Sequence, residues 1–296
     1  MDKEEKKKQS AEKAYEIIKK GLNRDTVLGI GTGSTTNYFI EILNQEKLDL
    51  KGAVCSSNAS EEYLKMSNIE ILSLNDVHKI DFYVDGADEF NSRKELIKGG
   101  GGALTREKIL AHSSETFICI VDDSKYSELL GNFPVPIEVI ELARSAISRE
   151  MMRLGGRPVY RNGFITDNGN QIIDVHHLDL NIPYETEKLI NNIPGVVENG
   201  IFSSRKADII IRATDSSIEE IKDIPAVNIP SIILRLSLLP FKIQLGWDCE
   251  EPWRVRCLSG VSSEGTDTPT PTGLRAVRQH GTRPHKGQIE RLESRV

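Results

Sequence analysis

Residues that could catalyse a proton transfer lie close together between positions 98 and 107. Lys98 offers a cation, Gly99 to Gly102 have no side chains, and Glu107 follows shortly after. Consecutive glycines allow a ligand to lie against main-chain N–H groups, which can then stabilise an oxyanion. Glu107 is expected near the start of a helix, where the helix dipole favours the ionised carboxylate. A carboxylate beside an oxyanion site is the arrangement needed for proton abstraction next to a carbonyl group.

An acidic cluster, Asp85-Gly86-Ala87-Asp88-Glu89, follows an apolar segment that is predicted to be a strand. In parallel α/β sheets ligands bind at the carboxyl ends of the strands. Three nearby acids repel one another unless a cation or hydroxyl groups share them, so a Mg²⁺ site and a solvated loop are both possible interpretations. Lys98 brings a cation to the same edge, which favours a substrate site over a metal site.

A glycine- and hydroxyl-rich turn, GIGTGSTT at 29–36, connects a short apolar segment to an amphipathic one. Between a strand and a helix, such a turn can bind an anion through backbone N–H groups and hydroxyls. Ser34 stands where the dinucleotide fingerprint needs glycine, and no Walker lysine follows. A tight turn with a hydroxyl cap is the alternative, but the many hydroxyls favour a monophosphate over a pyrophosphate.

The elements that must position these residues alternate along the chain. Strands are predicted at the apolar segments near 26–30, 53–57, 69–74, 81–85 and 116–125, with helices between them, including one at 10–20 capped by Ser10. This alternation predicts an α/β fold, with a parallel-sheet Rossmann-like domain. Residues 133–204, with a hairpin around Asn162-Gly163, predict a smaller α+β (ferredoxin-like) subdomain. The predicted domains are therefore 1–132 plus 205–223, and 133–204.

The composition limits the class of protein. The 296 residues carry a net charge of −6, which does not favour nucleic-acid binding. No apolar run approaches the roughly 18–20 residues of a membrane span, and the polar N-terminus is not a secretory signal. The four cysteines show no CxxC spacing. Free thiols in a reducing, cytoplasmic setting are therefore expected, without a zinc site or disulfides.

Four motifs together resemble ribose-5-phosphate isomerase type A: GIGTGSTT, YVDGADE, IKGGGGALTREKI and DSKYSELLGNFPVPIEV, in this order. LGGRPVYRNGFITDNGNQIIDVH resembles the small domain of that family, and the resemblance covers about residues 10–222. It implies interconversion of ribose 5-phosphate and ribulose 5-phosphate through an enediolate, without a metal or cofactor. It also implies a homodimer or homotetramer with a small-molecule substrate.

The resemblance also implies roles for individual residues. Glu107 would be the base, while Lys98, Asp85 and Asp88 would handle the sugar hydroxyls, ring opening and the developing oxyanion. Which of the two aspartates assists ring opening is left open. Lys7 or Lys8 could approach the phosphate, although the run Lys6 to Lys8 is otherwise expected to be a solvated face. The expected substrate-binding residues are Thr32, Gly33, Ser34, Thr35, Asp85, Gly86, Ala87, Asp88, Lys98, Gly99, Gly100, Gly101 and Lys125.

Two other functions are weighed against the isomerase. A non-catalytic sugar-phosphate-binding module would need the phosphate turn but would have no use for both Lys98 and Glu107. An amino-sugar-phosphate deaminase would usually carry a histidine near the acidic cluster, and none is present there. The isomerase is therefore the favoured interpretation.

The last part of the chain, 224–296, departs from the family. Residues 1–223 are rich in lysine and asparagine, whereas 224–296 are rich in arginine, and much of this last part lacks apolar periodicity. We expect a disordered tail that contributes nothing to catalysis. A shifted or extended reading frame would explain the change, and a partner-binding or membrane-surface segment is the alternative.

Overall fold

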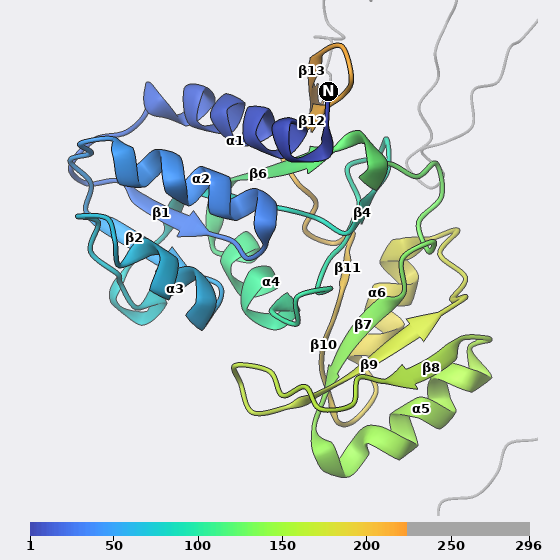
Figure 1. The fold of residues 1–296 in the computed structure, drawn as a ribbon. Helices are drawn as coiled ribbons and strands as arrows, with labels where there is room; N and C mark the ends of the chain where they lie inside the picture. Colours follow the sequence, from blue (N-terminus) through green and yellow to red (C-terminus); the bar gives the residue numbers. More distant parts are fainter. Residues whose placement is uncertain (224–296) are drawn as a thin grey trace, which may run out of the picture. The chain divides into compact units, whose positions relative to one another are not determined.

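A computed structural model of the chain describes residues 1–223 (Figure 1). The predicted tail at 224–296 lies outside the described residues. No helix in the described part is both long and apolar enough to cross a membrane.

The main sheet has six strands in the order β13-β12-β6-β3-β1-β2. Five strands are parallel, and β13 pairs antiparallel with β12 at one edge. The strands are β1 (Val27–Ile30), β2 (Gly52–Cys55), β3 (Ile80–Asp85), β6 (Ser114–Asp122), β12 (Ile209–Ala213) and β13 (Ile218–Lys222). Helices cover both faces, so the predicted α/β fold is confirmed.

The strand predicted at 69–74 is wrong. Only Ile71 forms an isolated β-bridge, with Ala53 of β2. Two hydrogen bonds, Ala53 N to Glu70 O and Leu72 N to Ala53 O, both 2.8 Å long, hold this segment along the outer edge of β2. The apolar side chains that suggested a strand pack partly buried against the cores instead.

The helices around the main sheet are α1 (Lys3–Lys19), α2 (Ser34–Gln45), α3 (Asn58–Leu64) and α4 (Leu104–His112). The first helix begins earlier than the prediction of a start at Ser10, because the Asp2 side chain caps it by accepting from Glu5 N at 2.8 Å. Ser10 lies buried inside the helix, and its hydroxyl donates to Lys7 O. The earlier start brings the N-terminal lysines onto a folded helix.

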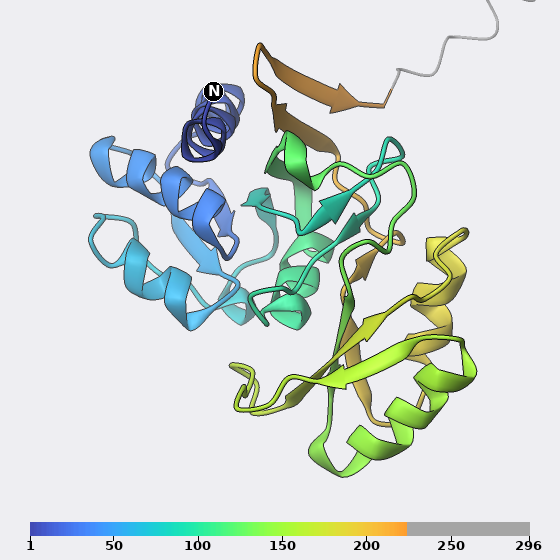
Figure 2. The ribbon, with the colours of Figure 1, turned by 45° about the vertical axis from the view of Figure 1, so that its right-hand side comes forward.

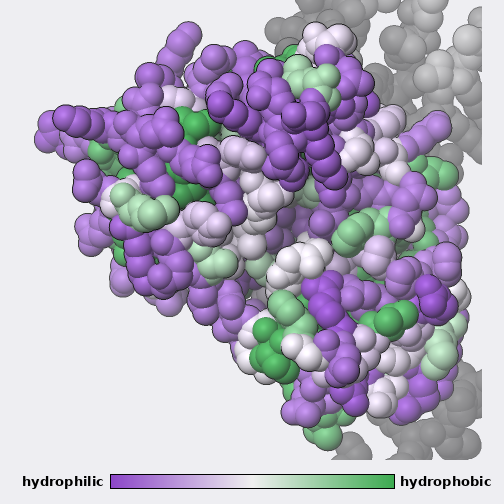
Figure 3. Space-filling model, in the orientation of Figure 1, coloured by the Kyte–Doolittle hydropathy of each residue, from purple (hydrophilic) through white to green (hydrophobic). Residues whose placement is uncertain are grey.

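The core is divided between the two faces of the sheet (Figures 1 and 2). On one face α1, α2 and α3 pack against alternate strand residues such as Leu28, Val84 and Ile118. On the other face α4 packs against the intervening residues, among them Tyr83, Phe117 and Cys119. The face seen in Figure 3 is mainly hydrophilic, with hydrophobic side chains scattered over it.

The small sheet is antiparallel, with four strands in the order β10-β7-β9-β8. Its elements follow one another as β7 (Val135–Val139), α5 (Arg144–Arg153), β8 (Arg157–Tyr160), β9 (Gln171–His176), α6 (Pro183–Asn191) and β10 (Val196–Asn199). This βαββαβ order is that of a ferredoxin-like unit, so the predicted α+β subdomain is confirmed as part of the fold.

A three-stranded antiparallel sheet combines two strands that lie between β3 and β6 in the sequence with one that follows the small sheet, and it leads into the glycine run. It consists of β4 (Glu89–Phe90), β5 (Leu96–Ile97) and β11 (Ile201–Phe202), in the order β11-β5-β4. Three short 3₁₀ turns complete the elements: η1 (Leu74–Asp76), η2 (Asp123–Lys125) and η3 (Glu141–Ala143). Lys98 directly follows β5, and its side chain reaches Asp85 at the end of β3.

Candidate active site

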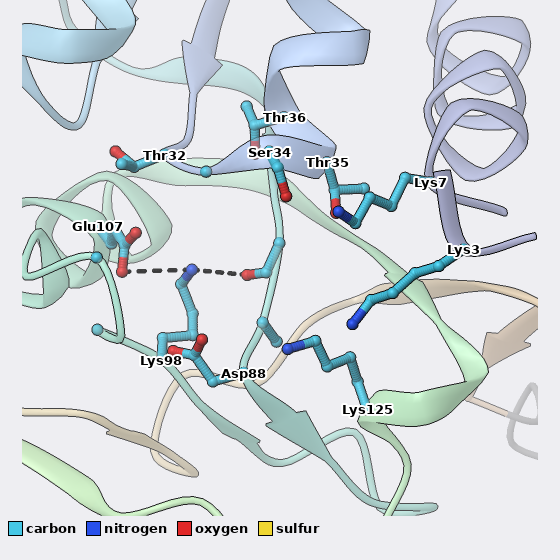
Figure 4. Close-up of a pocket in the computed structure, with 15 residues that line it drawn as sticks. Lys3, Lys7, Thr32, Ser34, Thr35, Thr36, Asp88, Lys98, Glu107 and Lys125 are labelled. Carbon is cyan, nitrogen blue, oxygen red and sulfur yellow. Dashed lines mark hydrogen bonds and ion pairs between the residues drawn. The ribbon is translucent and has the colours of Figure 1, made fainter. Parts of the chain in front are cut away.

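A pocket lies at the carboxyl edge of the main sheet, beside the ends of β1 and β3 (Figure 4). The elements that line it are α1, the β1–α2 turn, the loop after β3, the glycine run, α4 and η2. Eleven predicted substrate-binding residues line it: Thr32, Gly33, Ser34, Thr35, Gly86, Ala87, Asp88, Lys98, Gly99, Gly101 and Lys125. The predicted base, Glu107, lines it as well, together with Lys7, one of the two lysines that the sequence left open, and with Thr36 and Lys3, which the prediction did not include.

Lys98 and Glu107 form a buried ion pair at one end of the pocket. Lys98 Nζ lies 3.3 Å from Glu107 Oε2 and 2.8 Å from Asp85 Oδ2. The ammonium also donates to Gly86 O at 2.6 Å. Glu107 Oε2 has no hydrogen-bond partner in the described structure, although its side chain is only 5 % exposed. An unsatisfied buried carboxylate oxygen beside a pocket is available to a substrate proton.

The protein environment changes the proton affinity of both groups. Burial raises the pKa of Glu107 to about 8, against the opposing effect of the Lys98 charge, and the nearby Asp85 and Asp88 carboxylates raise it further. Burial by itself would lower the pKa of Lys98, but Asp85 and Glu107 outweigh it, so the pKa lies above its usual value. Lys98 therefore stays charged. The sequence led us to expect that the helix dipole would favour ionised Glu107. The structure shows instead that burial has the largest effect on its pKa and favours the protonated form.

The two predicted aspartates occupy different positions. Asp85 is fully buried and is not part of the pocket lining. It accepts from Thr32 N at 3.0 Å and Gly86 N at 2.7 Å, and from the Tyr83 hydroxyl. Asp88 lines the pocket, and its Oδ2 accepts from Gly100 N at 2.7 Å. Asp85 therefore holds the surrounding groups in place, whereas Asp88 faces the space a ligand would fill.

The hydroxyl-rich turn leads into α2, which begins at Ser34. The first N–H groups of a helix have no acceptor within it, and the helix dipole makes this end positive. Thr32 Oγ1 is held in a hydroxyl cluster, 2.7 Å from Ser56 Oγ and 2.8 Å from Ser57 Oγ. This end of the pocket is therefore suited to an anion.

Three lysines surround the same end of the pocket. Figure 4 shows Lys3 and Lys7 reaching in from α1 and Lys125 from η2, on the side away from Glu107. Lys3 and Lys7 lie four residues apart, so they share one face of the helix. This spacing is the signal in the sequence that could have found Lys3. Lys6 points elsewhere, with its Nζ 2.8 Å from Asp123 Oδ1, and Lys8 is exposed.

The glycine run is explained mostly by contacts within the protein. Gly99 and Gly102 have φ values of +102° and +84°, which favour glycine. A Cβ on Gly100 would lie 2.6 Å from Asp88 Oδ1, and one on Gly102 would collide with the Phe164 ring. Gly100 does not line the pocket, whereas Gly101 does, and a Cβ on Gly101 would make only an ordinary contact with Thr32 Cγ2 at 3.8 Å. Backbone conformation and tight packing thus account for Gly99, Gly100 and Gly102, but not for Gly101.

Among residues 1–223, no group of three or more His, Cys, Asp or Glu side chains could hold a metal ion. Each of the three acids in the acidic cluster has its own partner within the protein. Asp85 pairs with Lys98, Asp88 accepts from Gly100 N, and Glu89 accepts from three backbone N–H groups of the 131–133 segment.

The fold and the pocket are those of an α/β enzyme, with a buried lysine–glutamate pair at one end of the pocket and an end suited to an anion at the other. Comparison with known proteins gives the family: residues 52–216 match the model of ribose 5-phosphate isomerase A (phosphoriboisomerase A). This chain belongs to the ribose 5-phosphate isomerase A family, and it is a pentose phosphate isomerase. Family membership decides against the two alternative functions.

Several solved structures are similar over the same part of the chain. Ribose 5-phosphate isomerase A from Neisseria gonorrhoeae is 46 % identical with a TM-score of 0.72, and the match covers 75 % of this chain and 97 % of that one. The enzyme from Methanocaldococcus jannaschii is 37 % identical with a TM-score of 0.69, covering 74 % and 99 %. A D-ribose-5-phosphate isomerase in complex with phospho-erythronic acid is 40 % identical with a TM-score of 0.71, covering 75 % and 100 %.

Proposed function

We propose that this pocket interconverts D-ribose 5-phosphate and D-ribulose 5-phosphate, with Glu107 as the general base. In the aldose-to-ketose direction, Glu107 takes the proton from C2 of the open-chain sugar, and an enediolate forms. The same carboxylic acid then returns the proton to C1 while the hydroxyl proton on O2 passes to O1, which gives the ketose. Since one group accepts and returns the proton, the reaction needs no net change in the enzyme.

The observation that carries this proposal is the position of Glu107 Oε2. It is buried at the pocket, lacks a hydrogen-bond partner among the described residues and lies 3.3 Å from the Lys98 ammonium. A carboxylate with a pKa of about 8 is a stronger base than an ordinary one and is still partly ionised near neutral pH. The adjacent fixed cation favours the negative charge that develops on the enediolate oxygen.

The anion-binding end would hold the phosphate. Lys3, Lys7 and Lys125 gather there with the start of α2, so the substrate would lie with its phosphate near α1 and its C1–C2 end near Glu107 (Figure 4). Charge-assisted contacts of this kind are the strong ones in phosphate recognition. Phospho-erythronic acid, the ligand in one similar structure, combines a phosphate with a carboxylate on a four-carbon chain, which supports a site with two such ends.

Asp88 is the aspartate we assign to ring opening. It lines the pocket, whereas Asp85 is fully buried and accepts hydrogen bonds from neighbouring groups. Ring opening requires transfer of a proton from the anomeric hydroxyl to the ring oxygen, and only a group that faces the sugar can assist it.

The experiment is a turnover assay on the full chain with ribose 5-phosphate, in ¹H₂O and in ²H₂O, with EDTA present. Formation of ribulose 5-phosphate with solvent deuterium at the exchanged carbon is expected, because the proton resides on a titratable carboxyl between transfers. EDTA should leave the rate unchanged, because Lys98 supplies the positive charge. The absence of ribulose 5-phosphate formation would rule the function out, and complete retention of the substrate hydrogen would argue against a carboxylate base.

A further inference from the structure

One arginine of the small sheet contacts the glycine run directly. Arg161 follows β8, and its Nη1 donates to both Gly99 O and Gly100 O at 3.2 Å. These carbonyls belong to the two peptide groups that precede Gly100 and Gly101. The side chain therefore reaches from the small sheet to the backbone of the pocket wall.

The Arg161 side chain is itself held firmly. Its Nε donates to Asp174 Oδ2 at 2.8 Å, and Nη2 makes the second bond to the same carboxylate. The guanidinium also lies 5.4 Å from the centre of the Phe164 ring, and that ring fills the space next to Gly102. Bidentate pairing and the aromatic contact fix the plane of the guanidinium, so its remaining N–H groups are aimed at the glycine run.

The contacts of Arg161 with the two carbonyls also determine where the N–H groups of Gly100 and Gly101 point. In a trans peptide the carbonyl of one residue and the N–H of the next point in opposite directions. With Gly99 O turned to Arg161, Gly100 N–H points away from it and donates to Asp88 Oδ2 at 2.7 Å. With Gly100 O turned the same way, Gly101 N–H is directed toward the pocket that Gly101 lines. No acceptor for this N–H occurs within residues 1–223.

We propose that Arg161 is a positioning residue for the isomerisation: by holding the carbonyls of Gly99 and Gly100, it aims Gly101 N–H at the oxyanion of the enediolate and Gly100 N–H at Asp88. The inference rests on the proposed function. Donors that are already aligned need no reorganisation when the charge develops, which is why pre-positioned N–H groups are effective. Asp174 does not contact these carbonyls through the bonds described here, but it orients the Arg161 side chain that does.

The test compares Arg161→Lys, Arg161→Gln and Asp174→Asn with wild type and with Arg157→Gln, an exposed arginine on β8. For each we would measure kcat, KM, the Kd of phospho-erythronic acid, the Kd of inorganic phosphate and the Tm. Lysine keeps the charge but cannot pair bidentately with Asp174 while donating to both carbonyls. Both Arg161 variants should lower kcat by roughly 10- to 100-fold, somewhat less than loss of an oxyanion donor itself.

The pattern among the measurements separates positioning from a merely structural role. Phospho-erythronic acid should bind more weakly in proportion to the loss in kcat/KM, because its carboxylate tests the oxyanion site. Phosphate affinity and KM should change little, and Asp174→Asn should be intermediate. Arg161→Lys with kcat within twofold of wild type would overturn the proposal, as would a proportional loss of phosphate affinity. If Arg161→Gln does not fold, the lysine variant decides.

Failure of this inference is distinguishable from failure of the proposed function. Wild type that forms no ribulose 5-phosphate would refute the function and, with it, this role. Wild type that is active, together with Arg161 variants that keep full turnover, would refute the role of Arg161 alone.

Discussion

Glu107 Oε2 lies 3.3 Å from Lys98 Nζ, within ion-pair distance but without a well-aligned hydrogen bond from the described residues. Lys98 is instead directed at Gly86 O, 2.6 Å away, with Asp85 Oδ2 at 2.8 Å. The lysine is thus held by the end of β3, while the glutamate is left with an unused oxygen beside the pocket. A base needs such a free acceptor, and the neighbouring fixed cation keeps the ionised form accessible despite burial.

Replacing this oxygen tests the assignment directly. Glu107→Gln keeps the shape of the side chain but removes the base, so we expect turnover to fall by roughly 10²–10⁴-fold or more, with little change in substrate affinity. Steady-state kinetics and the binding of phospho-erythronic acid would measure the two effects. Glu115→Gln, which changes an exposed residue of β6, should leave turnover unchanged. A Glu107→Gln variant with a tenth of wild-type turnover would show that another group is the base.

The pH dependence of kcat/KM follows from the raised pKa of Glu107. Because the free enzyme must have this carboxyl ionised, kcat/KM should rise as the pH increases through about 8 and fall as the pH decreases below it. An unperturbed glutamate would instead give a limb near pH 4.3. The measurement is a profile of kcat/KM from about pH 5.5 to pH 9.5, with substrate ionisation taken into account. A flat profile across this range would mean that burial does not control the base.

The lysines at the anion-binding end should control affinity more than chemistry. Lys7→Ala and Lys125→Ala each remove a cation that lines the pocket, so we expect inorganic phosphate to bind roughly 10-fold more weakly, with a smaller effect on kcat. Calorimetry at low and moderate salt would measure this. Lys8→Ala is the matched control, because Lys8 is on the same helix but pairs with Glu12 at 3.9 Å outside the pocket. Unchanged phosphate affinity in Lys125→Ala would remove that residue from the site.

Substitutions at two glycines with the same φ can distinguish the energetic cost of backbone strain from that of overpacking. Gly102 and Gly155 both have φ of +84°, but only Gly102 has a side chain, Phe164, against its Cβ position. Gly155→Ala should destabilise the protein by about 1–2 kcal/mol through backbone strain alone. Gly102→Ala should cost about 1–3 kcal/mol more because of overpacking, and it should also lower turnover by displacing the pocket wall. Equal losses in chemical denaturation would mean that Phe164 moves aside freely.

Spacing along the chain was enough to predict the centre of the site. The hydroxyl turn at 29–36 and the acidic cluster at 85–89 lie at the carboxyl ends of β1 and β3 of the main sheet, whereas the stretch from Lys98 to Glu107 follows β5 of the three-stranded sheet. Because parallel strands deliver their following loops to one edge of the sheet, the first two motifs must meet there, and the charge of Lys98 indicated that the third lies beside the acidic cluster. The α/β fold followed from the same alternation, and the misassigned strand at 69–74 had little effect on it.

Other features depend on packing between distant parts of the chain. Lys3 and Lys7 contribute because α1 begins early and docks beside α2, and Arg161 contributes because the small sheet reaches the glycine run. The depth of Glu107, and the difference between buried Asp85 and accessible Asp88, likewise cannot be inferred from spacing. Periodicity and motifs report which residues share a local face. The free energy of packing the whole domain decides which face is desolvated and what it contacts. It thereby decides the pKa of Glu107 and the direction of the N–H groups of the glycine run.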